Sequence, residues 1–369
     1  MRLENKYSGF SVFGGLLKLG VITIMLTFAI PGPGATIKGS SPDGNTAIAH
    51  IKIGGNDQTV LVFGGGYDVR QNAGKYGVDP EGRALYITDA TTGSRVWWAS
   101  TADSTADLAL GDMAYSVLAS VTAGDVDADG YTDVAFTADL GGQIWRFDFD
   151  NSGYDTTITG GVIARLAGDD DGGNRRFFVR PDVSLIRIDG TDHFAVAIGS
   201  GSRDHPLSTE AQDRFYMLFL EHVYSPPTEY TVIEEDDLVD VTTNRNPDMA
   251  SSSGWRLDLE AGEKILAKSR TVDGTVMFTT YKPPGGKNKK FHALGQGTEN
   301  VYALNVYDAR PARSPDSVGG LTDLTPNDRF KALEQGGIQP EPQITFSDDD
   351  HQVVIVALEK NSDTGLYNP

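Results

Sequence analysis

The sequence predicts an all-β fold, and two features of its composition and pattern indicate this class. Its 369 residues include 43 glycines and 17 prolines. These residues stand between short apolar runs, which is typical of many strands joined by tight turns. Hydrophobic residues make up 39% of the chain, enough for a sizeable core, and long helical patterns are scarce. The length suits one large all-β domain or two ordinary ones.

From about Gln58 onward the pattern is strand, turn, strand. Thr59–Phe63 is a continuous apolar run, as in a strand buried on both faces. Ala84–Thr88 and Arg95–Ser100 are predicted to form a hairpin around a short loop that contains glycine near its end.

Four segments share an aromatic residue beside an aliphatic one, followed by a polar loop. We interpret them as equivalent strands of separate propeller blades with long insertions, because their spacing of roughly 60 to 85 residues exceeds that of a standard blade. The alternative is that any β protein contains such strands. The segments are Ala84–Thr88, Gly142–Phe149, Arg214–Leu220 and Asn300–Val306.

Further strands are expected along the rest of the chain. The Asp273-Gly274 pair is a typical tight turn, and the third, fourth and fifth of these strands are expected to form one meander. The predicted strands are Val183–Ile188, Phe194–Ile198, Trp255–Leu259, Lys264–Lys268, Val276–Tyr281 and Val353–Leu358.

Charge and cysteine content exclude some classes of function. The formal net charge is -20, so the surface repels nucleic acid phosphates and nucleic acid is not an expected partner. The chain has no Cys, which excludes disulfides and thiolate metal sites. The motifs of serine hydrolases, phosphate-binding loops and zinc proteases are also missing from the sequence. We therefore expect no enzymatic activity.

The amino-terminal part, residues 1–45, is expected to lie outside the domain formed by residues 46–369. Basic residues, the apolar run Leu19–Ile30 and a stretch of small residues follow one another, as in a signal peptide. The run is shorter than the stretch of about 20 apolar residues that a membrane-spanning helix needs. A second interpretation, that the segment is foreign to the domain, stays open.

An acidic loop with the sequence DVDADGYTD is the most specific feature. A hard divalent cation needs six to eight oxygens at about 2.3–2.6 Å. Alternate residues of a tight loop point inward, so Asp125, Asp127 and Asp129 can converge on one ion. Tyr131 can offer its backbone carbonyl, and Asp133 closes the ring directly or through water.

Without a cation, carboxylates this close would repel one another, which is the physical reason to expect a bound ion. Calcium fits better than magnesium because the loop is rich in oxygen and flexible, and the set lacks the Cys or His typical of zinc. Phe136 replaces the Glu that ends an EF-hand loop, and the flanks Tyr115–Thr122 and Val134–Thr137 are predicted strands. The alternative is an acidic turn without an ion.

Several stretches, taken together and in this order from about Thr46 to Leu358, resemble the C-terminal β-propeller of the PilY family of type IV pilus biogenesis factors, which are pilus-tip-associated proteins and adhesins. The stretches are VLVFGGGYDVRQN, GRALYITDATTGSRVWW, GDVDADGYTDVAFTADLGGQIWRFD, FFVRPDVSLI, AIGSGSRDHPLSTEAQDRFYML, AGEKILAKSRTVDGTVMFTTYKP and ENVYALNV.

The resemblance implies a modified seven-bladed, quinoprotein-like propeller, with calcium (Ca2+) bound by the acidic loop. It implies an exported protein at the pilus tip, on the cell surface or between periplasm and outer membrane. The implied partners are pilins or minor pilins and a host or abiotic surface, with no small-molecule substrate. The implied role is in pilus extension and retraction, adhesion and twitching motility. The family propeller begins with further blades upstream, so an incomplete propeller with an open edge is an expected outcome.

Two other classes of protein share features with this sequence. Integrin-α propellers carry similar calcium loops (FG-GAP type) and act as extracellular binding modules, but they repeat the loop in several blades, whereas this sequence has it once. Quinone-dependent dehydrogenases share the propeller architecture, but a shared fold does not transfer chemistry. Such an enzyme would be expected to hold its cofactor with a pair of Cys residues, and this sequence has no Cys.

Overall fold

The computed structural model describes most of residues 46–368. Its regular structure is almost entirely strand, and the two described helices are short 3-10 segments, η1 (Val69–Ala73) and η2 (Glu235–Asp237). The expected all-β class is confirmed. No helix in the described ranges is long and apolar enough to cross a membrane. The signal-like segment 1–45 lies outside the described residues, as do residues 74–76, 103–104, 169–171, 245, 251, 285–296, 313–327, 334–337, 347–352, 357–358, 361–366 and 369.

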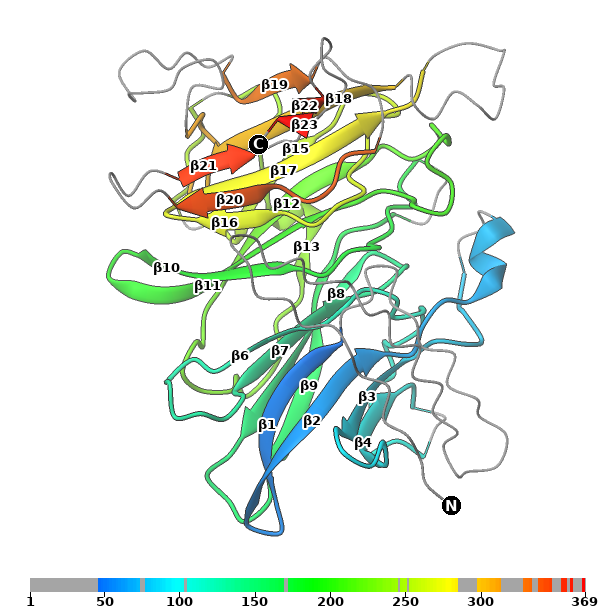
Figure 1. Ribbon diagram of the computed structural model, residues 1–369, viewed down its shortest axis with the longest axis vertical. Helices are drawn as coiled ribbons and strands as arrows, with labels where there is room; N and C mark the ends of the chain where they lie inside the picture. The colour runs from blue at the N-terminus through cyan, green and yellow to red at the C-terminus, as the bar shows by residue number, and fades with distance from the viewer. Residues whose placement is uncertain are drawn as a thin grey trace, which may run out of the picture.

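Four antiparallel meanders of four strands follow one another along the chain, and Figure 1 shows them ordered along the long axis of the molecule. The first sheet contains β1 (Ala47–Ile53), β2 (Asn56–Gly64), β3 (Ala84–Asp89) and β4 (Arg95–Ser100). The second contains β6 (Thr122–Gly124), β7 (Val134–Ala138), β8 (Gln143–Asp150) and β9 (Thr157–Arg165). The third contains β10 (Asp182–Ile188), β11 (Thr191–Gly199), β12 (Arg214–Leu220) and β15 (Gly254–Asp258). The fourth contains β16 (Arg270–Val272), β17 (Thr275–Lys282), β18 (Thr298–Asn305) and β19 (Phe330–Leu333).

Each of the first three sheets has one additional short strand at its outer edge. The fourth strand of each meander pairs in parallel with a strand of two residues: β5 (Leu108–Ala109) beside β4, β13 (Ile233–Glu234) beside β9, and β14 (Val239–Asp240) beside β15. Because β13 and β14 both belong to the connection between β12 and β15, that connection joins the second sheet to the third. Two short hairpins complete the described strands: β20 (Gln343–Phe346) with β21 (Val353–Val356), and β22 (Glu359–Lys360) with β23 (Tyr367–Asn368).

The four segments interpreted as equivalent strands overlap β3, β8, β12 and β18, and each of these is the third strand of its meander. First strands of different sheets also lie side by side, β1 with β6 and β10 with β16. Both features agree with blades of a propeller. Within the described residues the sheets do not close into a ring, so the expectation of an incomplete propeller is confirmed.

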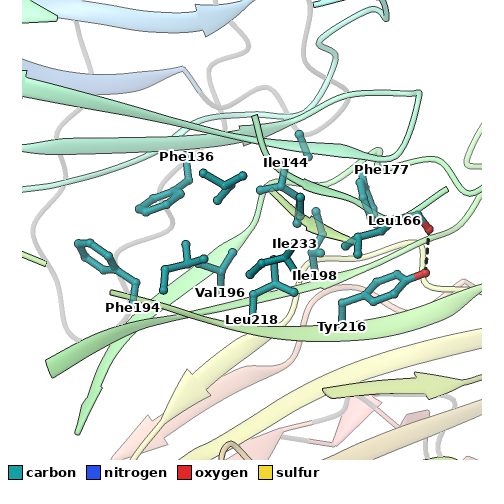
Figure 2. Close-up of a cluster of buried hydrophobic side chains, with 14 of the residues drawn as sticks. Phe136, Ile144, Leu166, Phe177, Phe194, Val196, Ile198, Tyr216, Leu218 and Ile233 are labelled. Carbon is teal, nitrogen blue, oxygen red and sulfur yellow. Dashed lines mark hydrogen bonds between the residues drawn. The ribbon is translucent and has the colours of Figure 1, made fainter. Parts of the chain in front are cut away.

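Consecutive sheets are held together by apolar seams, and strand β12 shows how its sequence creates two of them. Its side chains alternate between faces. Tyr216 and Leu218 face the cluster between the second and third sheets, while Phe215 and Met217 face the cluster between the third and fourth. Figure 2 shows the first of these seams, where the Tyr216 hydroxyl also donates to the Leu166 carbonyl oxygen at 3.1 Å. A strand buried on both faces therefore appears in the sequence as an unbroken apolar run.

The predicted strand Lys264–Lys268 is wrong. Lys264 forms a single bridge with Tyr281, and the next residue, Ile265, donates its N–H to the carbonyl oxygen of Ser200 in the third sheet. The segment passes from one sheet to the next and divides its hydrogen bonds between them. The predicted meander is therefore also wrong, because β15 and β17 belong to different sheets. The Asp273-Gly274 turn does join two strands, β16 and β17.

The predicted strand Tyr115–Thr122 is also wrong for most of its length, since β6 begins only at Thr122. The backbone before β6 bonds to turns of two sheets: the Val117 N–H donates to the Gly82 carbonyl oxygen at 2.9 Å, and the Leu140 N–H donates to the Ser116 carbonyl oxygen at 3.1 Å. An apolar run alone cannot distinguish such a segment from a strand.

Asp139, in the turn between β7 and β8, is completely buried. Its carboxylate accepts hydrogen bonds from the backbone N–H groups of Gly141 (2.9 Å) and Gln143 (3.0 Å) and from the Trp145 indole N–H (2.8 Å). Burial raises the pKa of Asp139 from 3.8 to about 7, an effect that these hydrogen bonds oppose and the negative charge of Asp79 reinforces.

We predict that Asp139 makes stability depend on pH between about 4 and about 7. Because its pKa is higher in the folded chain, its contribution to stability is fully present below about 4 and is lost as the pH rises through about 7. Asp139→Asn cannot titrate, so the difference in unfolding free energy, wild type minus variant, should fall across this range. Urea unfolding of both proteins measures it, and parallel pH profiles would contradict the prediction.

Candidate metal site

The acidic loop connects β6 to β7 at one end of the second sheet. The Asp133 N–H donates to the Gly124 carbonyl oxygen at 2.9 Å, which closes the loop at its base. The Asp133 carbonyl oxygen accepts the Phe149 N–H of β8 at 2.8 Å. The end of the loop is therefore fixed by the sheet.

Inside the loop the carboxylates accept hydrogen bonds from nearby backbone N–H groups, as in Asx turns. These bonds fold the loop tightly. They are Ala128 N–H to Asp125 Oδ1 (2.7 Å), Gly130 N–H to Asp125 Oδ2 (2.9 Å), Asp129 N–H to Asp127 Oδ1 (3.0 Å), Tyr131 N–H to Asp129 Oδ1 (2.8 Å) and Val126 N–H to Asp133 Oδ2 (2.6 Å).

Three of the four carboxylates expected as ligands come together in space. Asp125, Asp127 and Asp133 each place one carboxylate oxygen within 4.8 Å of the others. Asp129 is not part of this group, although it lies on the same loop. The Tyr131 hydroxyl donates to Asp57 Oδ1 of β2, whereas the atom of Tyr131 expected as a ligand is its backbone carbonyl oxygen. No second group of three such side chains occurs in the described part of the chain.

The carboxylates of the group affect one another. Burial is the largest cause that raises the pKa of Asp133, and the charges of Asp127 and Asp125 raise it further, while hydrogen bonds from backbone N–H groups lower it. Negative charge has thus been gathered at one place. An oxygen-only set of this kind fits a hard cation such as calcium.

Two backbone positions in the loop have positive φ angles: Ala128 at 63° and Gly130 at 95°. Glycine adopts such a conformation without strain, whereas alanine does not. A Cβ atom built on Gly130 would meet no atom within 4 Å. Glycine is therefore favoured at this position by the backbone conformation, and not because a side chain would clash with its neighbours.

The loop is attached to the first sheet. The Thr132 N–H donates to the His50 carbonyl oxygen at 2.9 Å, and the His50 N–H donates to the Thr132 hydroxyl at 3.2 Å. Lys52 of β1 places its ammonium group 4.7 Å from the centre of the Tyr131 ring. Sequence reasoning missed this attachment and the role of Asp57, because residues so far apart in the chain give no local signal.

A cavity of about 330 Å³ lies beside the loop. Asp127, Asp129 and Asp133 line part of it, and the remaining walls include Asn151 after β8 and residues 223–226 after β12. Two of the three converging carboxylates, those of Asp127 and Asp133, therefore border this cavity.

Comparison with known proteins finds similarity in sequence and in fold. A type IV pilus biogenesis factor PilY1 homolog from Xylella fastidiosa is 24% identical over 333 residues, which are 79% of this chain and 21% of that protein. The crystal structure of the Pseudomonas aeruginosa PilY1 C-terminal domain matches with a TM-score of 0.57 at 17% identity, over 85% of this chain and 70% of that one. Both matches are to PilY-type proteins. The expected resemblance to the PilY family is confirmed.

The matches cover only part of the relatives' length, and their sequence identities are low. The chain spans about a fifth of the Xylella PilY1 homolog, and no family model matches it. A quinohemoprotein alcohol dehydrogenase from Pseudomonas putida matches with a TM-score of 0.35 at 11% identity, over 84% of this chain and 50% of that one. That likeness is too weak to support any conclusion about chemistry.

We predict that two substitutions in the loop change the unfolding free energy differently. Gly130→Ala should lower the unfolding free energy by about 1–2 kcal/mol, because alanine is strained at this φ angle. Ala128→Gly should leave stability unchanged or raise it by up to about 1 kcal/mol, because it removes such strain at the cost of a more flexible unfolded chain. Urea unfolding in the presence of a chelator measures both. Equal losses in the two variants would show that the loop has a different conformation.

Proposed function

We propose that the chain is a calcium-binding β-propeller module of a PilY-type pilus biogenesis factor. In this proposal Asp125, Asp127, Asp129, Tyr131 and Asp133 hold one calcium ion. The supporting observation is that the carboxylates of three of them converge within 4.8 Å on a loop fixed to the sheet. Carboxylate and carbonyl oxygens are the ligands that calcium prefers, and calcium accepts a larger and less regular set of oxygens than magnesium does.

The role of the module follows from its relatives and is part of the proposal. Residues 46–369 would form the propeller domain, exported and located at the pilus tip, on the cell surface or between periplasm and outer membrane. Its partners would be pilins or minor pilins and a host or abiotic surface. It would support pilus extension and retraction, adhesion and twitching motility, and no catalytic role is included. The similarity to a PilY1 homolog and to a PilY1 C-terminal domain supports this assignment.

The attachment of the loop suggests how calcium would act on the fold. Thr132 follows the proposed ligand Tyr131 and is bonded to His50 of the first sheet. An ion that fixes the loop would therefore also fix the contact between the first and second sheets. A ligand that binds only the folded state stabilises it in proportion to its occupancy.

Calcium titration calorimetry on the full chain tests the metal site. We expect saturable binding of one ion with a dissociation constant of about 10⁻⁶–10⁻³ M, between that of sensor loops and of extracellular modules. The double variant Asp125→Ala, Asp133→Ala should not bind. The control Glu210→Ala, Asp236→Ala removes the same charge at exposed positions away from the loop and should bind like the wild type. A folded wild-type chain that binds no calcium would reduce the loop to an acidic turn.

A single substitution should change stability with opposite sign in two conditions. Without calcium, Asp127→Asn should raise the melting temperature, because it reduces repulsion among the three carboxylates. With saturating calcium, the same variant should melt below the wild type, because it binds the ion less tightly. Thermal unfolding in chelator and in calcium measures both. A shift of the same sign in the two conditions would contradict the proposed ligand role.

A further inference from the structure

A second and larger cavity, of about 740 Å³, lies between the second and third sheets. Its walls come from the turn between β10 and β11, the end of β12, and the long connection from β12 to β15. A cavity of this size holds a drug-sized molecule or a few side chains of a peptide. Much of its lining belongs to this long connection, and binding residues are commonly found in such connections.

The back wall of the cavity is formed by a buried ion pair and carries no net charge. Arg146 of β8 is buried and forms an ion pair with Asp148 at 2.6 Å. Its guanidinium also donates to the carbonyl oxygens of Glu221 (3.1 Å) and His222 (2.6 Å), and the Tyr230 hydroxyl donates to Asp148 at 2.7 Å. The positive charge of Arg146 is therefore neutralised by Asp148 and does not attract an anion.

Tyr230 is held against strand β9 by a close approach. A Cβ atom added to Gly161 would lie 2.8 Å from Cγ of the Tyr230 ring, so glycine at this position lets the ring lie against the strand. The ring and its hydroxyl thus form a fixed part of the lining.

The rim of the cavity carries uncompensated negative charge. Asp189, Glu221 and Glu229 line it, and Arg146 is the one Lys or Arg residue in the lining that the structure describes. Asp189 and Glu229 make no hydrogen bond or ion pair with the described part of the chain, whereas the Glu221 carboxylate lies 3.9 Å from the His193 ring. Carboxylates at the mouth of a cavity concentrate field lines and raise the local concentration of cations.

Inside the rim the lining offers apolar and aromatic surface. A lysine or arginine side chain matches this combination, because its hydrocarbon stem packs on apolar surface while its charged end meets carboxylates or aromatic rings. The residues that provide this surface are Ile163, Ile188, Phe219, Met249 and Tyr307.

We propose that this cavity is a docking site for a lysine- or arginine-bearing peptide segment of a partner protein. The charge of the rim favours a cationic group over a neutral sugar or an anion, and the apolar lining favours the stem of a long side chain over a small inorganic cation. None of the residues of the acidic loop lines this cavity, and the proposal does not require bound calcium.

Fluorescence anisotropy on the full chain tests the proposal with a labelled, capped peptide that contains two lysines and a leucine. Two matched peptides carry norleucine or glutamate in place of lysine. We expect the lysine peptide to bind at least about tenfold more tightly than either. Asp189→Asn and Glu229→Gln should each weaken binding about two- to fivefold, the range expected for solvent-exposed ion pairs. Asp236→Asn, which removes the same charge elsewhere, should have no effect.

A second pair of variants separates the cavity from the acidic surface in general. Ala250 is exposed and lines the cavity, so Ala250→Trp should fill it without disturbing the core and should abolish binding. Ala90→Trp places the same side chain in an exposed turn outside the cavity and should not. Far-UV circular dichroism checks that both variants fold. Equal binding of the three peptides, preferred binding of a neutral sugar, or lysine-peptide binding that survives Ala250→Trp would each overturn the proposal.

Discussion

Burial of apolar side chains between consecutive sheets is the constraint on which the rest of the described structure depends. The central strands of the second and third sheets have two apolar faces, and each face is covered by a neighbouring sheet. Phe136 of the second sheet meets Phe194 of the third edge-to-face at 5.3 Å, and Phe215 of the third stacks on Phe278 of the fourth at 3.9 Å. These seams fix the spacing and order of the sheets. They leave the connections at the ends of the strands free to vary.

The acidic loop is one such connection, and its position between two sheets gives it more than a local role. It begins and ends in the second sheet, while Thr132 bonds to His50 of the first. Charge repulsion inside the loop therefore acts on a junction between sheets. A cation at this place would stabilise a contact that the seams alone do not provide.

The two cavities share a wall. Residues 223–226 line the smaller cavity beside the acidic loop, and nearby residues of the same connection, including Tyr230, line the larger one. The Arg146–Asp148 ion pair stands between them, since Asp148 lines the first cavity and Arg146 the second. One connection, held by one buried ion pair, thus shapes both candidate binding sites. Because removing either partner would leave an uncompensated buried charge, both sites depend on this pair.

The sequence by itself determined the fold class, most of the strands and the acidic loop, because period-two alternation, tight turns and carboxylate spacing are local properties of the chain. It also identified the third strand of each sheet from its aromatic and aliphatic residues. The sequence could not show that Lys264–Lys268 is not a strand. Its hydrogen-bond partners, Tyr281 and Ser200, lie in other parts of the chain. Only the tertiary structure decided which carboxylates converge, where Asp57 and His50 meet the loop, and where Arg146 and Tyr230 build a cavity. These contacts join residues distant in sequence, and only the packing of one sheet on the next brings them together.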